Sequence, residues 1–276
     1  MLDLEFATCG RRWQADVSAP VDLAITLQFP GPQPRFFADA PASAAPLRAG
    51  GFVGAVSGGA SCNCSVYVLS PHCHGTHTEC VGHVTDNAAA LAGLTPVPPA
   101  LALLVSVRPE RLGTAAAGQA GRRAADDPVV TRALLATAAA RWAREPWTAL
   151  VVRTLPNDPG KRHRLYEGPC PAAYFTADAM HWVVERGVTS LVVDLPSLDR
   201  ADDGGSLTAH RVFWGLAPDV LDAHQARRGR ALVTELAYVP DTVHDGLYLL
   251  DLHVPAFATD AAPSRPVLYP LRKVAP

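Results

Sequence analysis

Six short apolar runs constrain the fold of this chain more than any other feature of its sequence. Runs of this length, bounded by turn residues, are typical of β-strands. Two helical segments lie among them, RALLATAAARWAR after Thr131 and ADAMHWVVER after Thr176, and threonine is a favoured residue before a first helical turn. This alternation predicts an α/β fold with a mixed β-sheet and flanking helices. The six runs are residues 65–70, 101–107, 149–154, 190–195, 231–239 and 247–254.

The length of the chain, 276 residues, is sufficient for one large domain with a proper core. No internal repeat is visible. The small and charged segment 115–128 (AAAGQAGRRAADDP read from Ala115) is the only candidate for an internal boundary, and it resembles a surface loop more than a linker. We therefore expect a single domain that spans residues 1–276.

Charge and hydropathy argue against several classes of protein. The net charge is −2, so no strong field would steer the chain to nucleic acid or to anionic lipid. The longest apolar stretch, 88–107, is broken by prolines, so we expect no membrane span. The first residues lack the pattern of a secretory signal, and four of the six cysteines are bunched between Cys62 and Cys80. We therefore expect the protein to be cytoplasmic.

The segment SPHCHGTHTECVGH, residues 70–83, concentrates four histidines, two cysteines and a glutamate. His77 and Glu79 are two residues apart, so on an extended backbone they point to the same side. Gly75 allows a tight bend immediately before them. Imidazole nitrogens and carboxylate oxygens together suit zinc, manganese or iron. The alternative interpretation is a polar loop that is rich in histidine by chance.

A glutamate in the middle of an apolar run is the strongest distant candidate for a metal ligand. Glu235 stands within ALVTELAYV, and burying a carboxylate is costly unless it is paired or coordinated. The other interpretation is an outward-facing residue on a half-exposed strand. His210 begins a second apolar segment after an aspartate-rich turn.

At these residues the sequence resembles the cyclase family, which includes bacterial kynurenine formamidases and isatin hydrolases. HGTHTE followed by His83 is similar to the family signature His-x-Gly-Thr-His-x-Asp-x-Pro-x-His, and VDLPSLDR (193–200) is similar to its Asp-x-Pro-Ser-x-Asp segment. His210 falls where the family has a second metal-binding histidine. TEL (234–236) resembles the strand that supplies a metal-binding glutamate, and AITLQFPGP (24–32) resembles a loop near the substrate.

Three departures from the signature affect the ligand set. Glu79 replaces the usual aspartate, and Val81 replaces the usual proline. The position two before Gly75 is Cys73, so the first histidine is displaced. We favour His72 as the ligand over His74, which directly precedes the Gly75 turn, while Cys73 stays a rival because a thiolate also binds zinc.

The resemblance implies the swivelling β/β/α type of fold, a homodimer or homotetramer, and hydrolysis of an amide C–N bond in an N-formyl compound, a lactam or a cyclic amide, as in an arylformamidase. It also implies one or two divalent ions per chain, zinc or manganese. His72, His77 and Glu79 would hold the first ion, and Glu79, His210 and Glu235 would hold or complete a second. His83, just beyond this set, is the predicted general acid or base acting with metal-activated water.

Other functions are compatible with the same residues. A cyclase or lyase acting on a biosynthetic intermediate would use the same metal and base without consuming water. A metal-binding protein without catalysis would need neither His83 nor an open coordination position. A cysteine-nucleophile hydrolase fits less well, because no paired base is legible beside Cys73 or Cys80. We expect a small-molecule substrate, and the sequence does not identify it.

Overall fold

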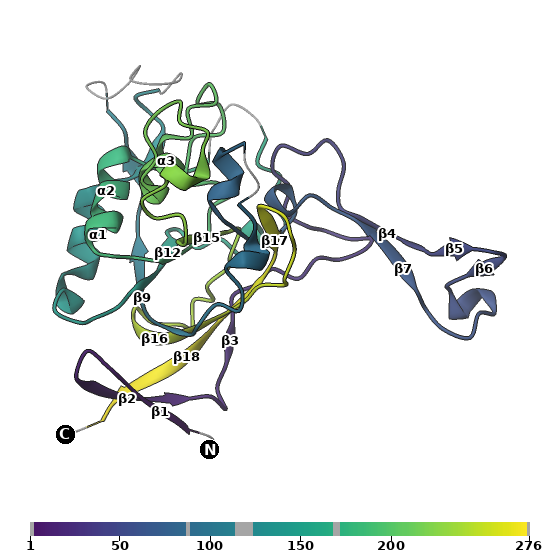
Figure 1. The fold of residues 1–276 in the computed structure, drawn as a ribbon, viewed down its shortest axis with the longest axis horizontal. Helices are drawn as coiled ribbons and strands as arrows, with labels where there is room; N and C mark the ends of the chain where they lie inside the picture. Colours follow the sequence, from purple (N-terminus) through teal and green to yellow (C-terminus); the bar gives the residue numbers. More distant parts are fainter. Residues whose placement is uncertain (1–2, 87–88, 114–123, 168–171, 275–276) are drawn as a thin grey trace.

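One large mixed sheet forms the body of the molecule. The computed structural model describes residues 3–86, 89–113, 124–167 and 172–274 (Figure 1). Within these residues an eleven-stranded sheet has the order β1-β2-β18-β16-β9-β12-β14-β15-β8-β17, with β3 paired to β18. Its strands are β1 Asp3–Thr8, β2 Arg11–Asp16, β3 Val21–Asp22, β8 His77–Glu79, β9 Ala100–Val107, β12 Ala149–Thr154, β14 Ser190–Val193, β15 Leu232–Glu235, β16 Gly246–His253, β17 Ala261–Pro263 and β18 Arg265–Lys273.

The centre of this sheet is parallel and its flanks are antiparallel. β9, β12, β14 and β15 run in the same direction, whereas β16 and β8 pair antiparallel to the outer members of this group. Strands buried on both faces are expected to be continuous apolar runs, and β12 is buried along its whole length. The predicted α/β fold with a mixed sheet is confirmed.

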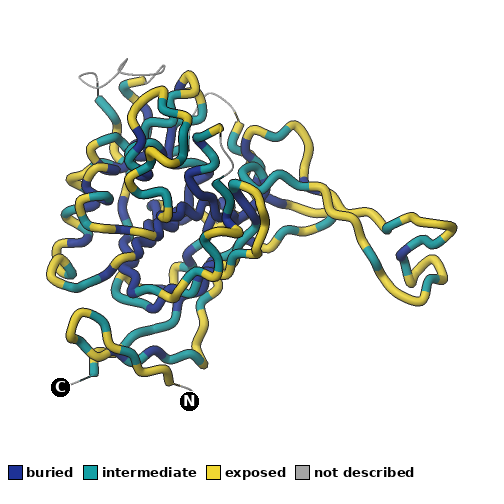
Figure 2. The backbone as a smooth tube through the Cα atoms, viewed as in Figure 1, coloured by how far each residue is buried: buried dark blue, intermediate teal, exposed yellow. Residues whose placement is uncertain are grey.

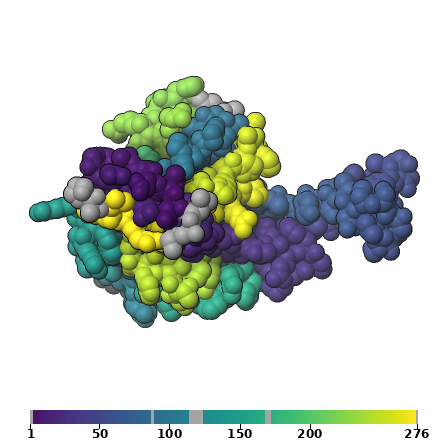
Figure 3. All heavy atoms as spheres, turned by 90° about the horizontal axis from the view of Figure 1, so that it is seen from below, coloured from purple at the N-terminus to yellow at the C-terminus, as the bar shows by residue number. Residues whose placement is uncertain are grey.

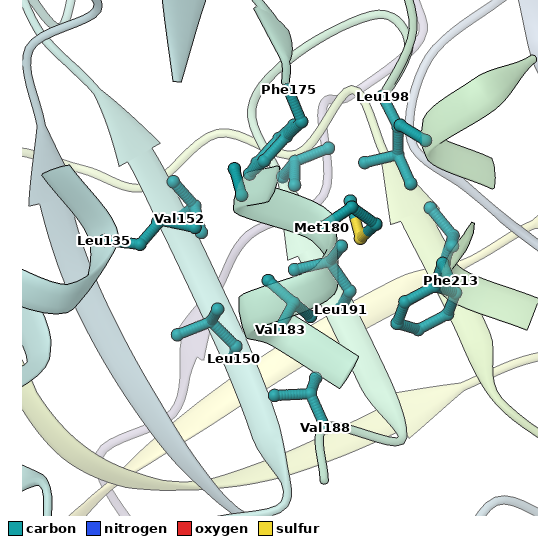
Figure 4. Packing of buried hydrophobic residues seen from close by; sticks show 14 of the residues in the cluster. Leu135, Leu150, Val152, Phe175, Met180, Val183, Val188, Leu191, Leu198 and Phe213 are labelled. Atoms are coloured by element: carbon teal, nitrogen blue, oxygen red, sulfur yellow. The ribbon is translucent and has the colours of Figure 1, made fainter. Parts of the chain in front are cut away.

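Three helices pack at one face of the sheet: α1 (Arg132–Ala139), α2 (Ala177–Glu185) and α3 (Thr208–Trp214). α1 packs on β9 and α2, and α2 packs on α3. Figure 4 shows Leu135 of α1, Met180 and Val183 of α2, and Leu150 and Val152 of β12 in one hydrophobic cluster. Alternate residues of β12 belong to this cluster because side chains point to opposite faces along a strand. This core fixes α3 and, with it, His210.

A long arm projects from this body. It consists of a hairpin, β4 (Ser43–Pro46) with β7 (Ser65–Val68), which is extended by the short strands β5 (Arg48–Ala49) and β6 (Phe52–Val53). Figures 2 and 3 show the arm standing clear of the rest of the molecule and largely exposed. The apolar run 65–70 is therefore a strand, as predicted, but all four residues of β7 are exposed because no second layer covers the hairpin.

Some elements are shorter than the sequence predicts. The run 231–239 is a strand only as far as Glu235, because Leu236 has a φ of +51° and its N–H donates to Leu195 instead of continuing the ladder. The first helix ends at Ala139 and continues as a 3-10 turn over Ala140–Trp142. A separate three-stranded sheet joins β10 (Glu110–Arg111), β11 (Pro128–Val130) and β13 (Tyr174–Phe175).

The candidate boundary at 115–128 falls mostly on residues 114–123, which lie outside the described residues. The expected domain range of 1–276 thus stays a prediction. In the part of the chain that the structure describes, no helix combines the length and the apolar character that crossing a membrane requires.

Candidate metal centre

The three-residue strand β8 brings the central pair of side chains into the core of the sheet. His77 and Glu79 point to the same face, and both are fully buried. β8 lies between two antiparallel neighbours: Glu235 of β15 is opposite His77, and Ala261 of β17 is opposite Glu79. Residues opposite one another in a ladder point to the same face, so strand register places Glu235 beside His77. Nε2 of His77 and Oε2 of Glu235 are 3.5 Å apart.

Gly75 makes the turn that returns the chain toward β8. Its φ is +82°, a conformation that side-chain-bearing residues rarely adopt, and an added Cβ would lie 2.9 Å from Leu27. Before this turn the 3-10 helix Pro71–Cys73 carries His72, whose Nδ1 is 3.0 Å from Oε2 of Glu79. His74 points elsewhere, and its ring contacts the carbonyl groups of Ser70 and Ala40. His72 thus lies at Glu79 and His74 lies away from it, and the role of His72 as a ligand stays a prediction.

His210 reaches the centre from α3. The carboxylate of Asp199 accepts hydrogen bonds from the backbone N–H groups of Ala209 and His210, and its Oδ2 lies 2.7 Å from Nδ1 of His210. One carboxylate therefore caps the helix and orients the imidazole, which directs Nε2 inward. That Nε2 is 2.9 Å from Oε1 of Glu79 and 3.3 Å from Oε1 of Glu235.

Four buried atoms at this point have no hydrogen-bond partner among the described residues: Nε2 of His77, Nε2 of His210 and both carboxylate oxygens of Glu79. The 2.9 Å separation of His210 and Glu79 does not have hydrogen-bond geometry, so proximity alone does not satisfy these atoms. Leaving such groups unpaired costs about 1–3 kcal/mol each. His77 and His210 each share a group of closely spaced donors with Glu79, the first with His72 and the second with His83. Such mixed nitrogen and oxygen donors fit zinc or manganese.

The charges of the centre support the same interpretation. Burial alone would raise the pKa of Glu79, but His83 and His210 hold that pKa well below its usual range. Burial alone would lower the pKa of His72, but the hydrogen bond to Asp260 and the nearby negative charge of Glu79 outweigh burial and raise it to about 10. The buried carboxylates thus require positive charge beside them, and a divalent ion would supply it while displacing protons from the histidines.

His83 lies at the edge of the centre, on the 3-10 helix Val81–Val84. Its Nε2 is 3.9 Å from Oε2 of Glu79, and its ring stacks on His72 with centroids 4.2 Å apart. It is about one-quarter exposed, so it can reach both the centre and solvent. The structure therefore brings all six predicted residues together: His72, His77, Glu79, His83, His210 and Glu235.

Asp260 is a member of the centre that the sequence did not indicate. Its Oδ2 is 2.8 Å from Nε2 of His72 and 3.7 Å from Nδ1 of His83. It directly precedes β17, so the pairing of β17 with β8 places it here. In the sequence it lies in an ordinary turn, TDAAPS, and no motif distinguishes it. Together with His72 and His83 it forms a second group of donors close enough to share an ion.

A family model described as "Putative cyclase" matches residues 16–200. The chain belongs to this family. The match includes the signature from His72 to His83, whereas His210, Glu235 and Asp260 lie beyond it. The cyclase-family resemblance of the sequence is confirmed.

Solved structures with the same fold include proteins named as hydrolases. A predicted metal-dependent hydrolase from Bacillus stearothermophilus superposes with a TM-score of 0.53 and 14% identity, over 91% of this chain and 98% of that one. Isatin hydrolase A from Labrenzia aggregata superposes with a TM-score of 0.54 and 13% identity, over 91% of this chain and 93% of that one. For isatin hydrolase A from Ralstonia solanacearum the TM-score is 0.53 and the identity 16%, over 92% of this chain and 91% of that one. A search of curated proteins gives no match.

Replacing Glu235 by Gln should weaken metal retention without unfolding the protein. The amide keeps the shape of the carboxylate, and its oxygen can still accept the 2.8 Å hydrogen bond from the N–H of Leu198, but it removes a negative charge from the centre. Metal content after dialysis checks this. Glu185→Gln, at an exposed carboxylate paired with Arg132, is the matched control and should keep its metal. A Glu235→Gln protein that keeps its metal and becomes more stable would make Glu235 a strained core residue instead.

Proposed function

We propose that this protein is a metal-dependent hydrolase that cleaves an amide C–N bond in an N-formyl compound, a lactam or a cyclic amide. The observation that carries the proposal is that unpartnered buried donors of His77 and of His210 each lie close to the unpartnered carboxylate of Glu79. The activity for which the isatin hydrolases with this fold are named supports the same class of reaction. An arylformamidase-like activity is the finer form of the proposal.

His72, His77, Glu79, His210 and Glu235 would hold one or two divalent ions, zinc or manganese. When bound, such an ion polarises a carbonyl group and makes water more acidic. Asp199 orients His210 for this role, and the hydrogen bond from Leu198 holds Glu235. Groups that would not touch the ion thus hold two of its predicted ligands in position.

His83 would move the proton. Its Nε2 would take a proton from the water that attacks the carbonyl carbon, and it would return that proton to the nitrogen that leaves as the C–N bond breaks. Asp260, which faces Nδ1 of His83 at 3.7 Å, is placed to hold the ring in the orientation that this transfer needs. A cyclase or lyase would use His83 without water, so the mass of the product separates the two reactions.

Exhaustive chelation should abolish amide hydrolysis, and adding back zinc or manganese should restore it. The experiment screens N-formyl, lactam and cyclic amide substrates with protein of known metal content, and it follows incorporation of ¹⁸O from labelled water. Full activity in metal-free protein would contradict the proposal, and so would a product without the added oxygen.

We further propose a homodimer or homotetramer, a small-molecule substrate and a cytoplasmic location. Val66 and Val68 support assembly, since they lie on one side of the projecting strand β7 and are 46% and 65% exposed. Apolar side chains on a protruding arm are typical of contacts between proteins. Light scattering on the purified chain tests the assembly.

A further inference from the structure

A buried ion pair lies outside the metal centre and has no part in the proposed mechanism. Nζ of Lys161 is 2.7 Å from Oδ2 of Asp194, and the two side chains are 6% and 0% exposed. Lys161 also donates to the carbonyl oxygen and to the hydroxyl oxygen of Thr154, at 2.7 and 2.9 Å. The ammonium group thus has a close protein acceptor for each of its three N–H donors.

The network around this pair joins the ends of neighbouring strands. Asp194 accepts hydrogen bonds from the backbone N–H and the hydroxyl group of Thr154, at 2.8 and 2.9 Å. Thr154 is the last residue of β12, and Asp194 directly follows β14, which pairs with β12. The side chain of Asn157 extends the network to the segment after β15, because it donates to the carbonyl group of Val239.

Stability alone does not account for such a pair. Removing two charges from water is costly, and this cost offsets much of their mutual attraction. Apolar residues of similar volume often stabilise a core as well as a buried ion pair does. In some proteins, buried charges instead specify one arrangement of the chain around them. The surroundings of Asp194 indicate which arrangement is at stake here.

The loop 194–199 leads from the ion pair to the metal centre. The N–H of Leu198 donates to Oε1 of Glu235 at 2.8 Å. The carboxylate of Asp199 lies 2.7 Å from Nδ1 of His210. The loop therefore contacts two predicted ligands, and their orientation depends on where the loop lies.

We propose that Lys161 is a positioning residue for the metal centre. By fixing Asp194, it holds the loop 194–199 in one place. The loop in turn directs Glu235 and His210 toward the ion. This inference deepens the proposed function and rests on it for the presence of the ion. Lys161 acts through the loop and does not touch the ion or the substrate.

Binding of cobalt(II) to the full chain tests the proposal with a readout other than activity. Cobalt(II) binds to the same kinds of nitrogen and oxygen donors as zinc, and its visible absorption spectrum depends on how those donors are arranged. Lys161→Met keeps a long side chain but removes the ammonium group. It should weaken cobalt affinity by about tenfold, the lower end of the usual effect when support for a ligand is lost. The visible spectrum of the bound cobalt should change as well.

Arg153→Met is the matched control. Arg153 is also a buried cation, on the same strand β12, and it pairs with Asp245 at 3.2 Å. It donates to the carbonyl groups of Pro240 and Val243. None of these partners belongs to the loop 194–199. Arg153→Met should lower the free energy of unfolding in urea and leave the cobalt affinity and spectrum unchanged.

A second variant covers the case in which Lys161→Met does not fold because Asp194 has lost its cation. The double variant Lys161→Met/Asp194→Asn removes both charges, and asparagine can keep two hydrogen bonds to Thr154. It should fold and again bind cobalt about tenfold more weakly. Lys161 variants that match Arg153→Met in affinity and spectrum would overturn the proposal. Failure of both Lys161 variants to fold would also overturn it, since the pair would then be needed for the fold itself.

The same preparations are assayed for amide hydrolysis, which keeps the two proposals separable. Cobalt binding that depends on Lys161, together with a lack of hydrolysis, would refute the hydrolase and leave the positioning role standing. Hydrolysis by the unmodified protein, with no effect of Lys161→Met on cobalt binding, would do the reverse. An unmodified protein that binds no cobalt would contradict both.

Discussion

His83→Ala should lower turnover by about a hundredfold or more while the protein keeps its metal and its fold, which is the usual loss when a general acid or base is removed. His83 is partly exposed, and its Nε2 is 3.9 Å from Glu79, farther than the nearest nitrogens of His72 and His210, so we expect the ion to stay bound without it. Some activity should survive, because polarisation of the substrate carbonyl does not depend on this side chain. Rate and metal content are measured on the same sample.

Two other outcomes have distinct meanings. Loss of metal together with activity would make His83 a ligand, acting with His72 and Asp260 as a second group of donors. Unchanged activity would remove His83 from the mechanism. Asp260→Asn is a useful companion, since it keeps the shape of the residue that faces Nδ1 of His83 and should lower turnover less than His83→Ala does.

Glu79→Gln should remove the metal and, with it, essentially all activity. Glu79 is the most central donor: it is fully buried, both of its oxygens lack hydrogen-bond partners, and it contacts His72 and His210 within 3.0 Å. An amide at this position would replace one acceptor oxygen with a donor NH₂ group and remove the charge that attracts the cation. Metal titration of the purified variant and circular dichroism would separate lost binding from lost fold.

Asp199→Asn should weaken metal binding less than Glu79→Gln does, and it serves as the comparison for that variant. Asp199 touches His210 but does not face the centre, so its loss should weaken metal affinity by about 10–100-fold without abolishing binding. Retention of metal by Glu79→Gln at the level of Asp199→Asn would contradict the central role of Glu79.

The sequence predicts the middle of the sheet well because periodicity and composition decide burial there. β12 has its predicted bounds, 149–154, β9 begins at Ala100 where 101 was predicted, and β16 covers 246–253 where 247–254 was predicted. Exposure of β7 could not be predicted in this way, since an apolar strand gives no indication of whether a second layer will cover it. The end of β15 at Glu235 depends on the hydrogen bond from Leu236 to Leu195, which is a tertiary contact.

Some residues of the candidate site could likewise be predicted from the sequence, and others could not. His77 and Glu79 can be predicted from their spacing, and Glu235 can be predicted from the cost of burying a carboxylate. Asp260 was missed because its position depends on β17 pairing with β8, a long-range register that local sequence does not encode. The structure places the six residues together. The ligand roles of five of them and the catalytic role of His83 stay predictions.

The register of β8 has a consequence for the stability of the whole chain. It places Glu79 beside groups from two distant segments, β15 and α3, so an ion held there would act as a cross-link that closes two long loops. Constraints of this kind remove conformational freedom mainly from the unfolded chain. A ligand that binds only the folded state also stabilises it in proportion to the logarithm of its concentration. Resistance of this protein to unfolding would then be set as much by the supply of metal in its surroundings as by the packing of its core.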